Sequence, residues 1–251
     1  MSFTFVNSIG MKFRYIHCHS ALVGCPVHEH KRLTTDLNRK LAKDLSPFWI
    51  AETVITQGQY YTVTNLSPSY FSNKQTHSKD FEYPVDSVSW KDSNRFCDLL
   101  SDLPVEKSLF RKYRLPSEIE WEAAARANTT SAFCYGSDIS TDLANFDGSF
   151  PYIDGPPGQY LGRTSKVRSY PPNAFGLFDV HGSVWEWCSD NFTLDEGSDL
   201  MTTCRVLKGG SWHTYARFCR SSCRDAGDPE IGFFDQGFRI VCEISHLSNP
   251  Y

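Results

Sequence analysis

Residues 209–241 read GGSWHTYARFCRSSCRDAGDPEIGFFDQGFRIV. Gly, Trp, Arg and Ser recur through this stretch, and the short runs between them (HTY, DAGD and FFD) follow neither the period of a helix nor that of a strand. These runs mix aromatic, acidic and very small side chains, which is typical of loops that carry binding or catalytic groups. The stretch therefore predicts a loop-rich functional surface, for which the rest of the chain must supply a scaffold.

The composition is that of an ordinary globular protein. Of 251 residues, 40% are hydrophobic and 22% are charged, and the net charge is −4 without any block of Lys or Arg. Nucleic acid is therefore not an expected partner. No apolar run approaches the length needed to span a bilayer, so we expect no membrane insertion. The sequence does not indicate an oligomeric state.

Nine cysteines are scattered along the chain without a tight spacing framework. The N-terminus lacks a charged region followed by an apolar one, so no signal peptide is recognisable. Together these features favour mostly reduced thiols and a cytoplasmic location. One or two disulfides remain an alternative, as does display at the cell surface by another route.

Two segments predict helices. In residues 87–104, Ser89 and Asp92 stand at capping positions before an apolar stripe, and Pro104 is expected to end the helix. In residues 114–127, Ser117 and Glu120 form a capping box. Alternation predicts strands in residues 3–16 and 47–64, and a closing pair in residues 205–212 and 237–244. The Gly- and Pro-rich stretch 133–175 predicts irregular structure.

Five motifs occur in order and cover nearly the whole chain. They are FWIAETVITQGQYYTV, YPVDSVSW, YRLPSEIEWEAAARA, NAFGLFDVHGSVWEWCSD, and RVLKGGSW followed by GFRIV. Together they resemble the formylglycine-generating-enzyme family, also called the sulfatase-modifying-factor domain. The resemblance implies an α+β, C-type-lectin-like fold with a small twisted antiparallel sheet, two helices and many long loops. It further implies one domain over residues 1–251, with 209–241 as a variable binding segment.

Several motif residues have a structural explanation of their own. Tryptophans are large apolar anchors for loops, glycines permit tight turns, and arginines tie loop carbonyls and carboxylates together. A scaffolding role is expected for Trp121, Trp185, Trp187, Trp212, Gly209, Gly210, Arg114, Arg126 and Arg239.

Oxidase members of the family use two cysteines spaced C-x4-C after GGS to bind copper, since soft thiolates suit monovalent copper. The resemblance places Cys219 at the second position and Thr214 at the first. A hydroxyl cannot replace a thiolate there, so we expect no enzyme activity and no required cofactor. The alternative is a copper-dependent oxidase of the formylglycine-generating type that acts on a protein cysteine.

Within this fold the chain most resembles the variable proteins of bacterial and phage diversity-generating retroelements. In these, fixed positions alternate with positions derived from Asn codons whose adenines are rewritten. The frame positions would be Gly209, Gly210, Ser211, Trp212, Ala216, Arg217, Cys219, Arg220, Ser221, Arg224, Pro229, Gly237, Phe238 and Arg239. The slot positions would be His213, Thr214, Tyr215, Phe218, Cys223, Asp225, Ala226, Gly227, Asp228, Ile231, Phe233, Phe234 and Asp235.

The genetic code is consistent with this assignment. An Asn codon randomised at both adenines never encodes Lys, Glu, Gln, Met or Trp, and no slot holds one of them. The aromatic and polar slot residues have the composition of an antibody-like binding surface. The resemblance therefore implies a ligand-binding protein whose partner is a variable protein or a cell-surface ligand. An adaptor domain without a diversified surface is a further alternative.

Two regions contain residue types that can bind metal ions. Asp179, Gly182, Val184 and Glu186 match positions that bind calcium in the family, so one calcium ion is possible; otherwise Glu186 would pair with buried donors. Ser183 departs from the Asn usual in the family. Residues 17–30 gather histidines and cysteines, but their spacing fits no zinc site, which favours a solvated loop.

Overall fold

The computed structural model describes residues 3–72, 81–194 and 203–245. The largest sheet contains β1 (Thr4–Val6), β2 (Lys12–Ile16), β5 (Phe48–Ala51), β11 (Val241–Ile244) and β6 (Arg111–Arg114). Its order is β1-β2-β5-β11-β6, and all neighbouring strands are antiparallel. The sheet thus joins the first and last described strands, and it confirms the strands predicted in residues 3–16.

A second sheet has the order β10-β7-β8-β9. It consists of β10 (Gln236–Gly237), β7 (Trp185–Asn191), β8 (Arg205–Lys208) and β9 (Arg224–Gly227). β10 pairs with β7 in parallel, and the other two pairs are antiparallel. A separate antiparallel hairpin links β3 (Ser20–Val23) to β4 (Lys40–Lys43).

Both predicted helices are confirmed. α2 (Trp90–Ser101) begins after Ser89, whose side chain accepts from the Asp92 backbone in a capping box. α4 (Glu118–Arg126) begins after Ser117, which forms a capping box with Glu120. In each case the cap satisfies backbone N–H groups that have no partner inside the helix.

The sequence predicted only two helices, whereas the described residues form two further α-helices. α1 (Gln57–Thr64) lies in a segment predicted as strand; Thr56 and Gln59 form a capping box there, so the end of the predicted strand is wrong. α3 (Pro104–Ser108) starts at the proline expected only to end α2. Proline is well tolerated at the first helical position, where its missing N–H is not needed.

The predicted closing pair of strands is also wrong. β8 pairs with β7 and β9, whereas β11 pairs with β5 and β6. Gly209 and Gly210 both have left-handed backbones, with φ of 95° and 73°, and they turn the chain away from β8. The chain returns as β10 beside β7 before it enters the other sheet as β11.

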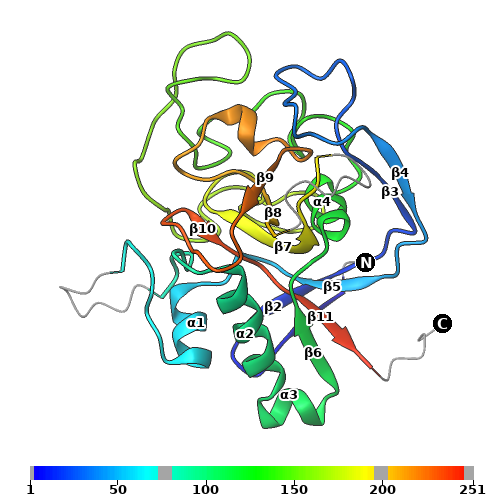
Figure 1. Cartoon of the computed structure of the whole chain (residues 1–251), viewed down its shortest axis with the longest axis vertical. Coiled ribbons are helices and arrows are strands. Elements are labelled where there is room, and N and C mark those ends of the chain that lie inside the picture. Colours follow the sequence, from blue (N-terminus) through cyan, green and yellow to red (C-terminus); the bar gives the residue numbers. More distant parts are fainter. Residues whose placement is uncertain (1–2, 73–80, 195–202, 246–251) are drawn as a thin grey trace.

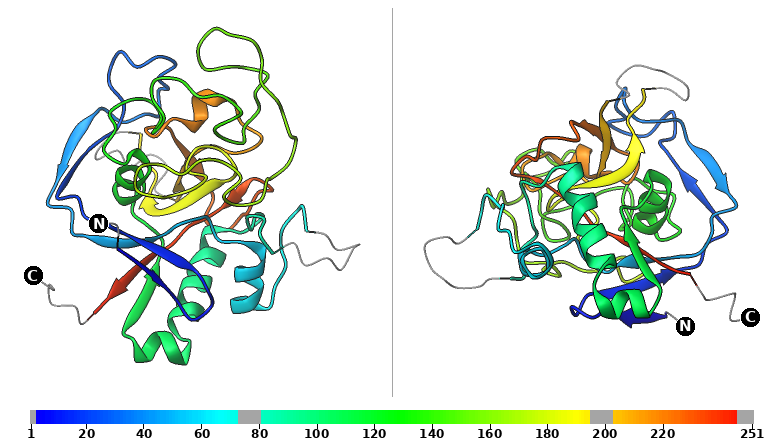
Figure 2. Two further views of the ribbon diagram at one scale, coloured as in Figure 1. Left: turned by 180° about the vertical axis from the view of Figure 1, so that it is seen from behind. Right: turned by 60° about the horizontal axis from the view of Figure 1, so that its bottom comes forward.

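Figure 1 shows the helices α1, α2 and α3 beside the five-stranded sheet in the lower half of the molecule. The short 3-10 helix of residues Ala216–Cys219, drawn in orange, lies in the upper half among long loops. The view from behind in Figure 2 keeps this 3-10 helix at the end of the molecule opposite α3. Residues 133–175 contain no helix or strand, as predicted.

Tryptophans anchor the core as expected. Trp121, Trp185, Trp187 and Trp212 are all at most 5% exposed. The indole of Trp187 donates to the Val88 carbonyl at 2.9 Å, so this ring is held by a polar contact as well as by packing. All nine cysteines are free in this structure. In the described ranges, no helix is both long and apolar enough to cross a membrane.

Candidate functional site

The frame positions of residues 209–241 are buried almost without exception. Two depart from this: Pro229 is half-buried and Arg217 is exposed. The buried ones are Gly209, Gly210, Ser211, Trp212, Ala216, Cys219, Arg220, Ser221, Arg224, Gly237, Phe238 and Arg239. The frame is therefore part of the scaffold, and its side chains fix the path of the segment.

Close contacts explain why several frame positions require the residue that they have. A Cβ atom on Gly210 would lie 2.7 Å from the Cys219 sulfur, so no larger residue fits. Arg220 is fully buried and donates to Asp36 at 2.7 Å and to Glu29 at 2.8 Å. A buried guanidinium with two carboxylate partners holds its loop far more firmly than an exposed ion pair would.

The cysteine- and histidine-rich N-terminal segment, residues 17–30, helps to fix the loop that contains Arg220. Glu29 accepts from Arg220 and Ser222, and the Cys25 thiol donates to the same carboxylate at 3.2 Å. Part of the segment is therefore buried scaffold, which corrects the expectation of a solvated loop. In the part of the chain that the structure describes, no three His, Cys, Asp or Glu side chains are grouped to hold a metal ion.

The slot positions mostly contact solvent. Six are exposed and five are half-buried. The exposed ones are His213, Tyr215, Asp225, Asp228, Ile231 and Phe233. The half-buried ones are Thr214, Phe218, Ala226, Phe234 and Asp235. We call these eleven residues the slot surface.

The expectation of solvent exposure is wrong for the other two slots. Cys223 is fully buried in the main hydrophobic core. Gly227 is buried, and a Cβ atom there would lie 2.2 Å from the ring of Trp187. Neither position can change its side chain without disturbing the core, so both belong with the frame.

Six rings meet at the centre of this region and form what we call the aromatic patch: Tyr70, Phe71, Tyr160, Trp212, His213 and Phe234. The Trp212 centroid lies 5.0 Å from His213, 5.3 Å from Phe71 and 5.6 Å from Phe234. His213 and Phe234 themselves are 5.3 Å apart, so slots from before and after β9 come together. Tyr70, Phe71 and Tyr160 lie far away in sequence, and no local signal marks them.

A second group of rings continues the surface. Tyr215 lies 4.4 Å from Phe150 and 6.5 Å from Phe218, measured between ring centroids. The Tyr160 hydroxyl, which is hydrogen-bonded to Nδ1 of His213, is within electrostatic reach of Tyr215. The second group of rings therefore lies near the aromatic patch.

Asp235 is held among these rings. Its carboxylate accepts from the Ser211 hydroxyl at 2.8 Å. Burial raises the pKa of this carboxyl, while the Ser211 hydrogen bond and nearby His213 act in the opposite direction. Burial and the repulsion of Asp235 also raise the pKa of Asp225, so the two carboxyl groups are close enough to interact.

A thiolate pair is not formed at Cys219. The sulfur is fully buried, and burial raises the pKa of the thiol to about 12, although the Thr214 side chain acts in the opposite direction. Thr214 donates its hydroxyl to the Ser211 carbonyl at 3.1 Å and accepts from the Ser211 N–H at 2.9 Å. His181, whose pKa burial lowers to about 4, donates Nδ1–H to the Cys219 carbonyl at 2.7 Å. These contacts are structural, and Cys219 remains a protonated thiol at neutral pH.

The calcium positions do not present a shell of free oxygen atoms. Arg239 donates to both oxygens of Glu186, at 2.7 Å for one of them, and Trp121 donates its indole N–H at 2.7 Å. Calcium at Glu186 would have to displace a guanidinium. Asp179, Gly182 and Val184 are buried as well, and one Asp179 oxygen has no hydrogen bond. Calcium here stays a prediction, and the pairing of Glu186 does not fit it.

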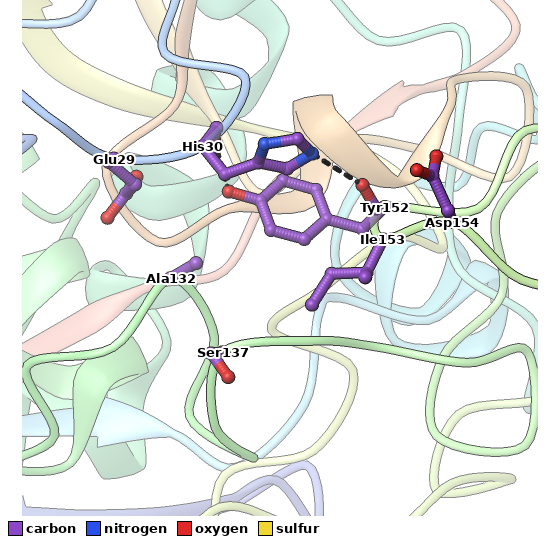
Figure 3. Close-up of a pocket in the computed structure, with 7 residues that line it drawn as sticks. All are labelled: Glu29, His30, Ala132, Ser137, Tyr152, Ile153 and Asp154. Atoms are coloured by element: carbon purple, nitrogen blue, oxygen red, sulfur yellow. Dashed lines mark hydrogen bonds between the residues drawn. The ribbon is translucent and has the colours of Figure 1, made fainter.

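A pocket of about 320 Å³ is lined in part by Ala132 and Tyr152, which belong to the same apolar cluster as Ala216 and Cys219 of the frame. Figure 3 shows the rings of His30 and Tyr152 side by side in it, with Glu29 and Asp154 at opposite ends. The imidazole is hydrogen-bonded to the Tyr152 carbonyl at 3.0 Å. Glu29 is already bound to Arg220 at 2.8 Å.

Comparison with known proteins agrees with the motifs. The model of the sulfatase-modifying factor enzyme 1-like domain matches residues 30–244. A formylglycine-generating enzyme of Thermomonospora curvata is 28% identical over 218 residues, or 79% of this chain and 65% of that protein. An inactive C-alpha-formylglycine-generating enzyme 2 of Bos taurus is 32% identical over 168 residues, or 64% of this chain and 50% of that protein. The chain thus spans about half to two thirds of these relatives, which include both an active and an inactive protein.

Solved structures share the fold. PvdO from Pseudomonas aeruginosa aligns with a TM-score of 0.78 at 25% identity, over 96% of this chain and 98% of that chain. Treponema denticola variable protein 1 aligns with a TM-score of 0.73 at 23% identity, with the same coverage of both chains. These alignments confirm the predicted α+β, C-type-lectin-like fold with few helices and many loops.

Proposed function

Because this chain belongs to the sulfatase-modifying factor enzyme 1-like family, we propose that it is a non-catalytic member that binds a ligand through the slot surface. The ligand is a protein or a molecule displayed on a cell surface. Diversification of the slot codons would change which ligand is bound while the scaffold stays the same.

One observation carries this proposal. In residues 209–241, buried frame residues and solvent-facing slot residues alternate over a backbone that has little regular structure. Catalytic loops need fixed side chains at their solvent-facing positions, because chemistry depends on exact group types. A surface whose exposed side chains are independent of the core is instead suited to changing specificity.

The composition of the slot surface also supports recognition. Tyr215 and Phe233 are 37% and 50% exposed, although they are large aromatic side chains. Exposed rings of this kind supply contact area at a small entropic cost, and they dominate the binding energy of many interfaces. Aspartates beside them can give directional polar contacts.

Two further points favour binding over oxidation. The first cysteine of the copper pair is replaced by Thr214, and Cys219 is buried as a thiol. The fold is also that of Treponema denticola variable protein 1, a protein named for its variability. The oxidase alternative rests on the named relatives of known activity and would require copper binding without a thiolate pair.

Sequencing of the gene in many cells of one population tests the diversified surface. We expect substitutions to cluster at adenines of the slot codons, and an adenine-rich near-copy of codons 213–236 to lie beside a reverse-transcriptase gene. We further expect codons 223 and 227 to be invariant in folded proteins, because Cys223 and Gly227 are buried. Substitutions spread evenly over frame and slot codons would contradict the proposal.

A further inference from the structure

The carboxylates of the molecule differ in how their charge is balanced. In the described ranges, the buried acidic residues are Asp36, Asp86, Asp179, Glu52, Glu106, Glu122 and Glu186. Five of them form an ion pair with Arg or Lys, namely Asp36, Glu52, Glu106, Glu122 and Glu186. Asp179 has none, but the positive charges of Arg239 and Arg168 lower its pKa against the effect of burial. Asp86 has neither kind of compensation.

Asp86 is fully buried next to the aromatic patch. One carboxylate oxygen accepts from the Tyr70 N–H at 2.6 Å and from the Ser87 hydroxyl at 2.8 Å. The other oxygen has no hydrogen-bond partner among the described residues. Burial raises the pKa of Asp86 to about 6, and the charge acting on it from nearby is that of Asp235, another acid. A buried carboxylate with one unpartnered oxygen and no cation beside it among the described residues is unusual, and a positively charged group of a ligand would compensate its charge.

Asp235 links this buried group to the solvent. It contributes to the raised pKa of both Asp86 and Asp225, so three carboxyl groups are within electrostatic reach of one another. Asp225 is exposed, and its own hydrogen bond is to the adjacent Ala226 N–H. None of the three forms an ion pair in the part of the chain that the structure describes.

The basic groups of this region are engaged elsewhere. Arg163 lies over the rings of Phe71 and Tyr83, with the guanidinium carbon 5.5 Å from the Phe71 centroid. Arg217 lies over Phe218 at 4.6 Å. His213, which acts on Asp235, is hydrogen-bonded to Tyr160.

The aromatic patch adds chemistry of the matching kind. Aromatic faces attract ammonium and guanidinium groups, and this attraction strengthens where water is excluded. Trp212, which is 5% exposed, has an indole N–H with no acceptor among the described residues. The same region therefore offers uncompensated negative charge and aromatic faces. A peptide can match both with a basic side chain.

We propose that the slot surface binds a protein segment through a Lys or Arg side chain, which lies against the aromatic patch and pairs with Asp225 and Asp235 above the buried Asp86. This inference rests on the proposed ligand-binding function and names the chemistry of the ligand. The cation restores near Asp86 the charge balance that the other buried carboxylates obtain within the chain. Asp225 and Asp235 are slots, so other variants of the segment can lose this preference, whereas Asp86 is fixed.

The affinity of the slot surface for a peptide with a Lys or Arg side chain should rise with pH. A cation is attracted by ionised carboxylates, and burial raises the pKa of Asp86 to about 6, so this carboxyl is partly protonated in mild acid. Burial raises the pKa values of Asp225 and Asp235 as well. Binding is therefore expected to be stronger at about pH 7.5 than at about pH 5.

The test uses the full chain and a random linear peptide library displayed on phage. Peptides are selected on the wild-type protein and counter-selected on a blank variant that carries Tyr215→Ser and Phe233→Ser. We expect selected peptides to be enriched in Lys and Arg over the input library. Asp225→Asn and Asp235→Asn should each weaken their binding by about tenfold, as measured by fluorescence anisotropy. Asp98→Asn, at an exposed position on α2, is the matched control and should change nothing. Melting curves establish that each variant is folded.

The outcomes separate the two proposals. Peptides that depend on Tyr215 and Phe233 but carry no excess of Lys or Arg would overturn the cation inference and leave the binding function standing. The cation inference would likewise be overturned, and the binding function left standing, if both Asp→Asn substitutions leave the affinity for the peptide unchanged or if this affinity falls as pH rises. Failure to select any peptide that prefers the wild type to the blank variant would overturn the binding function, and the inference with it.

Discussion

Two arginines three positions apart show how residues 209–241 are built. Arg220 is fully buried and pairs with Glu29 and Asp36, whereas Arg217 is exposed and rests on Phe218. The same residue type thus holds the segment at one position and borders its surface at the other. Burial, rather than residue type, determines which of the two side chains supports the scaffold.

The comparison extends over the whole segment. Buried frame residues contact the sheets and the N-terminal loop, which fixes the backbone of a segment whose strands and 3-10 helix are short. Slot residues contact mainly solvent and one another, so their identity has little effect on the scaffold. Stability and recognition are thereby assigned to different side chains of one loop.

The largest expected effect comes from Arg220. Arg220→Met removes the partner of two buried carboxylates and should lower the free energy of unfolding by about 3 to 5 kcal/mol. Arg217→Met is the matched control and should change it by less than about 0.5 kcal/mol. Urea denaturation measures both, and similar losses would mean that the two positions do not differ as described.

The aromatic residues offer a second comparison. Trp212→Ala should lower the free energy of unfolding by about 3 to 4 kcal/mol, because it leaves a cavity at a buried position. Phe233 is 50% exposed, and Phe233→Ala should change stability by less than about 0.5 kcal/mol. A loss for Phe233→Ala as large as that for Trp212→Ala would place this ring in the core.

Asp86→Asn should stabilise the protein. The pKa of Asp86 is raised in the folded state to about 6, so the folded form binds its proton more tightly than the unfolded form does. Stability contributed by this group is present in acid and lost as pH rises through 6. Removing the charge should recover about 1 to 3 kcal/mol at about pH 7.5 and much less at about pH 4. Thermal unfolding at both pH values measures the difference, and a destabilised variant at the higher pH would show that Asp86 has a cationic partner in the free protein.

Thr214→Cys has the smallest expected effect on folding, within about 1 kcal/mol, but it should change the chemistry. The new sulfur would lie beside Cys219, since Thr214 is already within hydrogen-bond reach of that thiol. We expect one equivalent of Cu(I) to bind the variant and none to bind this pair of positions in the wild type, as competition with a colorimetric chelator would show. Formation of an aldehyde on a sulfatase-type cysteine peptide by the wild type would support the oxidase alternative.

Sequence alone predicted the fold through local signals and the order of its motifs. Capping boxes at Ser89 and Ser117 marked two helices, and the one at Thr56 would have marked a third had alternation in residues 47–64 not favoured a strand. Cys223 and Gly227 were misplaced because their burial depends on the core and on Trp187, which lies far away in sequence.

The residues that surround the slot surface could not be predicted from the sequence for the same reason. Tyr70, Phe150 and Tyr160 reach the segment only through the tertiary fold. Asp86 stands inside the motif YPVDSVSW, but nothing in that motif indicates that its charge is uncompensated. Charge balance of this kind depends on contacts between distant residues, so it appears only in three dimensions.

The separation of frame from slots is tested most directly by randomising each set in turn. One library replaces the eleven codons of the slot surface by those reachable from Asn codons through adenine changes. A second library applies the same codon set to the buried frame positions, and protease resistance on the yeast surface measures the folded fraction of each. We predict that most members of the slot library remain folded and that almost none of the frame library does. Equal folded fractions in the two libraries would contradict the account.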